Sequence, residues 1–499
     1  MESYRYLENH FGRIIKVEEI SSMLGWDQQV FMPKGSSSLR AQQLAFLKTL
    51  RHEWLTDKKL PEWLATAQEK QHDLSTAEKI NLREMQRAYL HASCVPADLV
   101  KQLAEKSSLC LSVWQEAKQN SDFTKVQPYL EDVVALVRQK ATVKAEALQC
   151  SVYDALHSEF NPGGSSEKID KTFAQLLTFL PKRVQEIVEH QKKQSQPVAI
   201  EGSFSSELQH EFARKLATWL GFDFEHGRLD VSSHPFTGGI SGDIRITSRY
   251  EESNLMYGLS ALVHEFGHAL YDGNFPEKWR GQPLGDSMLM GMTIHESQSL
   301  IWERQIGLSH AFWHFLAPKI AEHFALSSDV ASADNLFKIA RKVECGFIRT
   351  AADEVTYPLH VILRYEIEKA LIEGRMSVKD IPEVWQQKMQ DYLGVIPPNH
   401  KMGCMQDIHW FGGSFGYFPC YAMGAMTAVQ FFNTAQQDLP NMMAHIERGE
   451  FEAFSAWLKT NIHQHGCLYQ PDELVKKVTQ ETLNVSLFDT YLKNEYLNG

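Results

Sequence analysis

The 499-residue chain has little cysteine, and its cysteines form no paired motif. There are seven cysteines, an odd number. They are scattered along the chain, and no two of them have the C-x-x-C spacing. This pattern excludes a disulfide framework and a thiolate zinc site, and it is typical of a reducing compartment. We therefore expect a cytoplasmic protein.

Excess positive charge and long apolar runs are also lacking. The net charge is −12, which argues against nucleic acid or an anionic membrane as the main partner. The N-terminal MESYRYLENHFGR has neither the apolar segment nor the cleavage site of a secretion signal. The most apolar run, residues 416–432, contains a proline, two tyrosines and a glutamine and is too short for a confident membrane span. We expect it to form a buried helix.

Helical patterns dominate what is present. Hydrophobic residues make up 43% of the chain, enough for a large core. Apolar residues recur at helical spacing over residues 169–187, and STAE at 75–78 has the form of a helix capping box. The exception is DIRIT, residues 243–247, where isoleucines alternate with polar residues as in a short strand. The sequence therefore predicts a mainly α-helical protein with a small β-sheet.

A His-Glu-x-x-His motif occurs within LVHEFGHALYDG, residues 262–273. In a helix, His264 and His268 lie one turn apart on the same face. Two neutral imidazoles at this spacing bind Zn²⁺, and Glu265 between them is placed to activate a metal-bound water. The neighbouring residues are apolar, and a buried glutamate is costly unless a cation or proton lies nearby. The alternative is a pair of core histidines without a metal.

A catalytic zinc ion needs a third protein ligand and an open position. The extended motif with a third histidine is absent, because Tyr271 and Asn274 stand where its glycine and histidine would be. We favour Glu296 as the third ligand and keep Glu303 in reserve. Thr293 and Glu296 also fit a capping box, which is the structural alternative for this glutamate. The other acidic residues within reach are Glu277 and Asp286.

Two further stretches carry residues that suit catalysis or binding. Residues 403–421 group Asp407, His409, Tyr417 and Tyr421 around glycine-rich turns, and histidine or tyrosine can donate a hydrogen bond to a developing oxyanion. The same stretch can equally be a structural turn with buried aromatic residues. Arg349 lies on the apolar face of a predicted helix, and a buried arginine needs an anion. That anion is either Asp353, four residues later, or a substrate carboxylate.

Six short motifs stand in the order found in the carboxypeptidase Taq family of metallocarboxypeptidases, which this chain resembles over nearly its whole length. The resemblance implies a mainly helical fold in which a small sheet and the HExxH helix lie beside a long active-site cleft. The motifs are HPF (234–236), DIRIT (243–247), HEFGH (264–268), HESQ (295–298), IRTAAD (348–353) and GCMQDIHW (403–410).

The resemblance also implies a role for individual residues around the metal. His264, His268 and Glu296 would be the ligands of one zinc ion. Glu265 would serve as the general base and then as the general acid. The same ligand set can hold Co²⁺ or Mn²⁺ in place of zinc.

Substrate contacts follow from the resemblance in the same way. Arg349 would bind the C-terminal carboxylate of the peptide. His409 and one tyrosine would stabilise the transition state, and we prefer Tyr417 to Tyr421. The residues that would line or brace the groove are His234, Asp243, Arg245 and Thr247.

The predicted function is a zinc-dependent carboxypeptidase that releases single residues from peptide C-termini with broad specificity. We expect the strand at 243–247 to lie at a sheet edge, where it can pair with the peptide backbone. The expected partner is a peptide with a free C-terminus, without nucleic acid or membrane, and the resemblance implies a homodimer. Two alternatives remain. One is a helical zinc endopeptidase, and the other is a non-enzymatic helical binding protein with HEFGH in its core.

No internal repeat or low-complexity linker divides the sequence. We therefore expect a single metallocarboxypeptidase domain over residues 1–499. Within it we distinguish an N-terminal helical part, a catalytic part and C-terminal helices. Their approximate limits are 1–225, 226–430 and 431–499.

Overall fold

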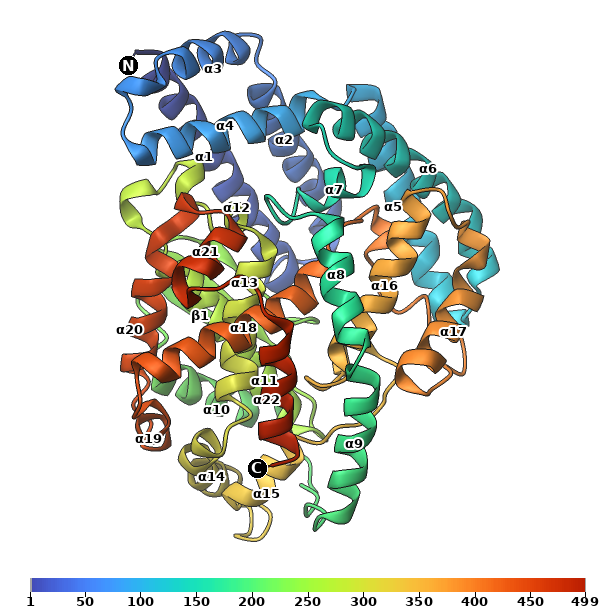
Figure 1. The fold of residues 1–499 in the computed structure, drawn as a ribbon, viewed down its shortest axis with the longest axis vertical. Helices are drawn as coiled ribbons and strands as arrows, with labels where there is room; N and C mark the ends of the chain where they lie inside the picture. Colours follow the sequence, from blue (N-terminus) through green and yellow to red (C-terminus); the bar gives the residue numbers. More distant parts are fainter. Residues whose placement is uncertain (1, 499) are drawn as a thin grey trace.

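The first four helices form a layer at one end of the molecule, across the top of Figure 1. The computed structural model describes residues 2–498. An apolar cluster that includes Leu7, Leu60 and Met85 holds these helices together. The capping box predicted at Ser75 and Glu78 is confirmed at the start of the fourth helix. The layer consists of α1 (Glu2–Val30), α2 (Ser37–Leu55), α3 (Leu60–Glu69) and α4 (Thr76–Ser93).

A second group of helices packs around another apolar cluster. The periodic residues predicted over 169–187 are buried in it, but they form two helices rather than one. Pro181 lies in the first turn of the second helix, where proline favours a new helix start. The group consists of α5 (Ala97–Asn120), α6 (Phe123–Leu148), α7 (Val152–His157), α8 (Ser166–Leu177), α9 (Leu180–Lys193), α16 (Tyr357–Ile372), α17 (Ile381–Leu393) and α22 (Val485–Tyr496).

The third group contains the HExxH motif and surrounds its own apolar cluster. The motif lies in α11, which packs against α13 and against the central strand of the sheet. A π-helical segment, Ile301–Ile306, directly follows α13. The helices of this group are α10 (Ser206–Leu220), α11 (Leu255–Gly273), α12 (Ser287–Met290), α13 (Met292–Leu300), α14 (His310–Phe324), α15 (Ala333–Ala340), α19 (Met442–Glu447), α20 (Glu452–Asn461) and α21 (Pro471–Thr479).

The sheet has the order β1-β3-β2, with β1 (Gly227–Val231) parallel to β3 (Asp243–Ser248) and β2 (Thr237–Ile240) antiparallel to it. The strand predicted at 243–247 is therefore correct, but its predicted place at the edge is wrong. Alternation of apolar and polar residues shows that one face is buried, and it carries no information about strand order. β3 has its main-chain groups paired on both sides, so a free edge exists only on β1 and β2.

The apolar run at 416–432 forms a buried helix, as predicted. It lies within α18 (Pro419–Asp438). This helix contributes side chains to both the second and the third apolar clusters, and the predicted division at about 430 falls inside it. No helix within residues 2–498 is long and apolar enough to cross a membrane.

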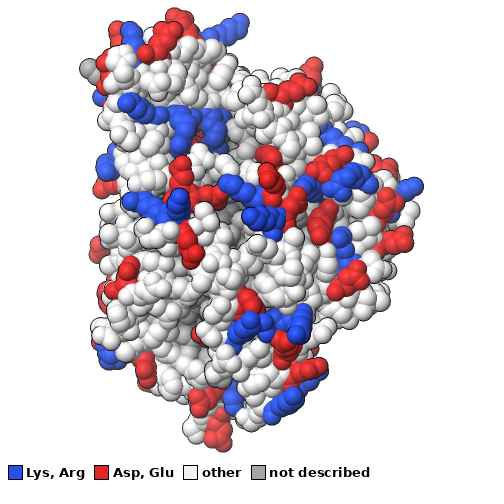
Figure 2. All heavy atoms as spheres, in the orientation of Figure 1, with Lys and Arg blue, Asp and Glu red and all other residues white. Residues whose placement is uncertain are grey.

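Charged side chains of both signs are interspersed on the face drawn in Figure 2. Many of them form ion pairs between neighbouring elements. For example, Nζ of Lys168 lies 2.5 Å from Oδ2 of Asp472, and this ion pair links α8 to α21.

Candidate active site

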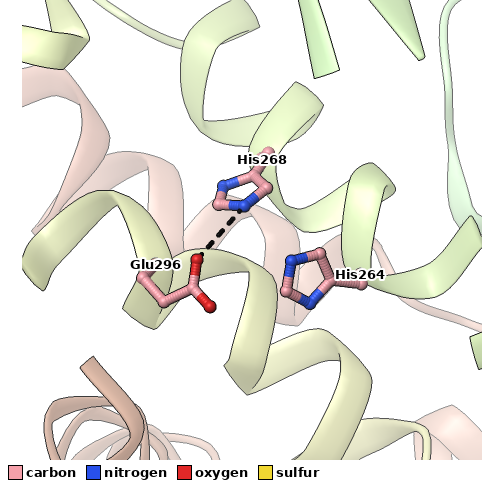
Figure 3. Close-up of side chains that lie close together, drawn as sticks. All are labelled: His264, His268 and Glu296. Carbon is pink, nitrogen blue, oxygen red and sulfur yellow. Dashed lines mark ion pairs between the residues drawn. The ribbon is translucent and has the colours of Figure 1, made fainter. Parts of the chain in front are cut away.

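Three predicted ligands converge on one point between α11 and α13. His264 and His268 lie one turn apart on α11, with ring centroids 5.0 Å apart. Glu296 of α13 faces them, and its Oε2 lies 3.5 Å from Nε2 of His268 (Figure 3). One ligand atom from each of the three side chains lies within 4.8 Å of the others. This arrangement can hold a single metal ion.

A glycine in the motif allows the two helices to approach closely. A Cβ atom on Gly267 would lie 2.4 Å from the carbonyl oxygen of Gln298 and 2.6 Å from Cα of Ser299. On the other side of α13, a Cβ atom on Gly424 of α18 would lie 3.1 Å from Cβ of Glu296. Any larger residue at Gly267 would push the histidines away from Glu296.

The capping-box alternative for Glu296 is wrong. Gly291 precedes α13, and no side chain caps the start of the helix. Glu296 lies in the second turn of α13, is 6% exposed and points towards the histidines. The side-chain oxygen of Thr293 is not part of a capping box. Glu296 is thus free to act as a ligand.

Glu303, kept in reserve as the third ligand, forms a hydrogen bond with His264. It lies in the π-helical segment after α13, and its Oε2 is 2.6 Å from Nδ1 of His264. A carboxylate on Nδ1 directs Nε2 of the same ring towards the ligand site. Glu303 therefore orients the ring of His264, a predicted ligand, and the sequence gives no signal for this role because the two residues are 39 positions apart.

The donor set fits a divalent metal ion. Two imidazoles and one carboxylate form a usual ligand set for catalytic zinc. Three carboxylates, those of Glu265, Glu296 and Glu303, stand around the two imidazoles of His264 and His268, so the centre has an excess of negative charge. Burial opposes charge on His264, yet the hydrogen bond that its Nδ1–H donates to the Glu303 carboxylate raises its pKa to about 10. Burial likewise opposes charge on Glu296, but the histidines lower its pKa to about 2. The centre thus stabilises positive charge.

A second layer of polar residues supports His268 from behind. The ring of His295 lies against it at a tilt of 34°, with the ring centroids 4.5 Å apart, and Nε2 of His295 lies 3.1 Å from Oδ1 of Asp272. Nδ1 of His268 is buried without a hydrogen-bond partner in the part of the chain that the structure describes. His268 turns its Nε2 towards Glu296.

Glu265, the predicted general base, lies beside the ligands and is 6% exposed. Its Oε2 accepts a hydrogen bond from the hydroxyl of Thr237 at 2.7 Å, and the same hydroxyl lies 3.0 Å from the Glu265 carbonyl oxygen. Thr237 begins β2, so this contact fixes the edge strand next to Glu265. Sequence reasoning did not identify Thr237.

Arg349 lies in a 3₁₀ turn, Arg349–Ala351, and not on a helix face as predicted. Asp353 is not its partner either. That carboxylate accepts hydrogen bonds from the backbone N–H groups of Val355 at 3.0 Å and Thr356 at 2.9 Å, just before α16. An i,i+4 pair needs a continuous helix, and the turn does not provide one.

Two arginines share the carboxylate of Asp407. Nη2 of Arg349 lies 2.9 Å from Oδ1, and Nε of Arg364 lies 2.6 Å from Oδ2. Burial opposes the charge of Asp407, but the two arginines hold its pKa far below the usual range. One carboxylate between two guanidinium groups leaves an excess of positive charge. Nη2 of Arg364 is buried without a partner among the described residues. Such a pair is suited to bind an anion.

His409 and two tyrosines form an aromatic cluster near the start of α18. Nε2 of His409 is 3.5 Å from the hydroxyl of Tyr421, and its ring is 5.8 Å from that of Tyr417. Burial lowers the pKa of His409 to about 4 and raises that of Tyr421 to about 12, so both are neutral near pH 7. The charge of Glu296 helps to raise the pKa of both tyrosines. The preference for Tyr417 stays a prediction.

The loop that carries His409 is held by Glu368, which sequence reasoning also missed. This fully buried carboxylate accepts hydrogen bonds from the Tyr153 hydroxyl (2.7 Å), Nε1–H of Trp410 (2.9 Å) and N–H of Gly416 (2.6 Å). Burial raises the pKa of Glu368 to about 7. Glu368 lies 42 positions from Trp410, so only the fold brings them together.

The residues predicted to line or brace the groove contact one another or the backbone. Asp243 and Arg245 form a two-point ion pair, with distances of 2.9 and 2.7 Å. Thr247 is fully buried, and its hydroxyl accepts a hydrogen bond from N–H of Phe236 at 2.9 Å. It braces the loop before β2. His234, in the same loop, is exposed.

Fold and site together define a class of protein. A mainly helical body holds two histidines and a glutamate around one point, and a second glutamate stands next to them. A metal ion held in this way activates water for hydrolysis. The protein is a helical metallopeptidase.

Comparison with known proteins specifies this class further. A sequence profile described as carboxypeptidase Taq (M32) metallopeptidase matches residues 6–496, and the chain belongs to this family. Thermostable carboxypeptidase 1 of Thermus thermophilus is 38% identical over 488 residues, 96% of this chain and 95% of that protein. Carboxypeptidase 1 of Bacillus subtilis is 36% identical over 502 residues, which are 100% of this chain and 99% of that protein. The chain is thus a metallocarboxypeptidase.

Solved structures agree with this assignment. Trypanosoma cruzi metallocarboxypeptidase 1 superposes with a TM-score of 0.97 at 34% identity over 100% of both chains. A carboxypeptidase of Pyrococcus furiosus gives a TM-score of 0.95 at 31% identity, over 100% of this chain and 99% of that one.

Proposed function

We propose that this metallocarboxypeptidase depends on zinc and removes single residues from peptide C-termini with broad specificity. The observation that carries the proposal is the convergence of His264, His268 and Glu296 beside Glu265. When bound there, zinc would supply a Lewis acid that lowers the pKa of a water molecule and polarises the scissile carbonyl. The family supports removal from the C-terminus.

Glu265 moves the proton in this mechanism. It lies next to His264 and is held by the hydroxyl of Thr237 at 2.7 Å. Its carboxylate takes a proton from the attacking water and then passes it to the leaving amine. Replacing this group removes both proton transfers without removing a ligand.

His409 and a tyrosine stabilise the charge that develops on the carbonyl oxygen. A buried tyrosine that stays protonated near pH 7 can donate a hydrogen bond to an oxyanion. We assign this role to Tyr417, whose ring lies 5.8 Å from that of His409, with Tyr421 as the alternative because its hydroxyl lies 3.5 Å from Nε2 of His409. Nε2 of the neutral His409 then orients the tyrosine hydroxyl or donates directly, depending on its tautomer.

Arg349 sets the position of the peptide C-terminus. The excess positive charge of Arg349 and Arg364 around Asp407 favours a carboxylate ligand. Of the two arginines, Arg349 is 6% exposed and Arg364 is fully buried, so Arg349 makes the contact. A fixed carboxylate places only the last peptide bond at the metal.

β2 pairs with the main chain of the substrate. Its outer edge pairs with no other strand of the described sheet, and the Gly239 carbonyl on this strand accepts a hydrogen bond from the Ser22 hydroxyl at 2.8 Å. Its first residue, Thr237, contacts Glu265. Main-chain pairing gives affinity with little preference for side chains, which accounts for broad specificity. The Asp243–Arg245 pair, Thr247 and His234 brace or line the groove beside it.

The test uses an N-blocked peptide with a free C-terminus beside the same peptide with an amidated C-terminus. Mass spectrometry follows both over time. We expect stepwise loss of single residues from the free peptide only, abolished by a chelator and restored by zinc. Glu265→Gln should lower kcat by several orders of magnitude while the protein still binds metal.

Each alternative gives a different result in the same assay. A zinc endopeptidase cuts internal bonds in both peptides, and that outcome would refute the C-terminal assignment. A binding protein gives no cleavage when folded and loaded with zinc, and it shows no effect of Glu265→Gln beyond stability. Replacing Zn²⁺ with Co²⁺ or Mn²⁺ after chelation measures how strictly the site requires zinc.

We also propose that the protein works as a cytoplasmic homodimer. All seven cysteines are free thiols, which suits a reducing compartment. Exposed apolar side chains on α2, such as Leu39 and Phe46, provide a surface that a second copy can cover.

A further inference from the structure

A second group of metal-ligating side chains lies on the surface formed by α14 and α15. His310 is the first residue of α14, and His314 follows one helical turn later. Asp334 lies in the first turn of α15 and faces them. One ligand atom from each of these three residues lies within 4.8 Å of the others. All three side chains are exposed, so an ion can reach them directly from solvent.

The three side chains are well placed to act together. Nδ1 of His310 is 3.9 Å from Oδ1 of Asp334, close enough for one ion to bridge both atoms with a small change of rotamer. The rings of His310 and His314 are 6.3 Å apart and inclined by 30°. His310 also stacks on Phe337 at 3.5 Å, which limits the rotation of its ring. Partial burial lowers the pKa of His310, which favours the neutral imidazole that a metal ligand requires.

The first turns of α14 and α15, which carry these residues, are both held by a capping serine. The hydroxyl of Ser309 caps α14 by accepting a hydrogen bond from N–H of Phe312 at 3.2 Å. The hydroxyl of Ser332 caps α15 by accepting one from N–H of Asn335, also at 3.2 Å. The two helices pack side by side near the lower end of Figure 1. Both first turns therefore hold their ligands at defined positions.

We propose that His310, His314 and Asp334 form a second, auxiliary site for a divalent transition-metal ion. Two imidazoles and a carboxylate select a first-row ion such as Zn²⁺ over Mg²⁺ or Ca²⁺. Because the ligands are exposed, water completes the coordination, and the site binds more weakly than the buried catalytic one. A bound ion ties the start of α14 to the start of α15.

The experiment titrates the metal-free full-length protein with Zn²⁺ by calorimetry. The wild type should bind two equivalents, a tight one and a weaker one. His314→Ala and Asp334→Asn should each weaken the second equivalent at least tenfold and leave the first unchanged. Peptidase activity at one equivalent of zinc should stay unchanged in both variants, because neither residue touches the catalytic centre. His72→Ala, which removes another exposed histidine, serves as the matched control.

A second arm separates this site from the catalytic one. In a His264→Ala background the tight equivalent should be lost while the weaker one persists with its affinity within twofold of the wild type. The proposal is wrong if the wild type binds one equivalent only. It is also wrong if the second equivalent is unaffected by both His314→Ala and Asp334→Asn.

Discussion

Glu303 controls the orientation of His264 through one short contact, at 2.6 Å from Nδ1. Glu303→Gln keeps a hydrogen-bond acceptor of the same size but removes the negative charge that favours a cation at the centre. We expect zinc affinity to fall by about 10- to 100-fold, the usual effect of losing such a partner. Competition with a chelator of known affinity measures this change.

The control for this substitution is Glu322→Gln, which removes an exposed carboxylate on α14. It should leave zinc affinity within twofold of the wild type. If Glu303→Gln and Glu322→Gln behave alike, Glu303 has no role in the metal centre. Glu296→Gln should cause a larger loss than either, because it removes a ligand.

Residue by residue, local sequence predicted the side chains that lie one helical turn apart and missed those brought together by the fold. His264 and His268 were predictable because a helix places positions four apart on one face. The residues that hydrogen-bond to the predicted site residues could not be predicted in this way. Glu303 lies 39 positions from His264, and Asp407 lies 58 positions from Arg349. The Asp353 pairing failed because it assumed a helix where the chain forms a 3₁₀ turn.

At the scale of elements, Glu368 of α16 holds the loop between His409 and α18. Its two oxygens accept three hydrogen bonds, including those from Trp410 and Gly416. In Glu368→Gln the amide NH₂ must face one of these donors, so the loop shifts. We expect kcat/KM to fall by about tenfold or more, consistent with the loss of positioning near the reaction. Glu366→Gln, on the same helix but facing Lys388, should leave kcat/KM unchanged.

The same glutamate gives a pH dependence of stability. Burial raises its folded-state pKa to about 7 from the ordinary value of 4.5 for an exposed glutamate. The folded protein therefore binds more protons than the unfolded chain between these values, and the free energy of unfolding falls as pH rises through this window. The contribution of this group is about 3 kcal/mol. Urea titrations at pH 5 and pH 7 measure the free energy of unfolding, and we expect Glu368→Gln to remove this fall with rising pH. An equal change of the free energy of unfolding between the two pH values in wild type and variant would contradict the prediction.

Element types were largely predictable, and their arrangement was not. The strand at 243–247 and the buried helix at 416–432 follow from their patterns. Periodicity did not show that Pro181 divides residues 169–187 into two helices or that β3 is central. The order of strands depends on pairing between distant segments, which alternation within one strand does not encode.

At the scale of the whole molecule, one helix joins the two large apolar clusters. α18 contributes Ala422 and Met426 to one cluster and Ala425 and Phe431 to the other. It also carries Gly424 against Glu296. Glu296, the predicted third ligand, is therefore fixed where the two large apolar clusters meet. The helices α1 to α4 form a separate cluster.

The N-terminal layer presents the surface expected to join two copies. α2 buries only Leu55 among its residues, while Leu39 and Phe46 are 65% and 67% exposed. Leu39→Glu and Phe46→Glu each place a charge where two apolar faces would meet, and a charge buried without a partner is costly. We expect light scattering to give about twice 57.1 kDa for the wild type and about 57.1 kDa for each variant at the same concentration.

Ile396→Glu, at a site that is 57% exposed elsewhere on the molecule, should remain dimeric. Circular dichroism of all three variants checks that the helices are intact. A monomeric wild type would refute the homodimer, and a dimer that survives both α2 variants would place its interface elsewhere. Because α2 contributes no residue to the catalytic centre, the monomeric variants should keep their kcat, so that assembly and catalysis can be measured separately.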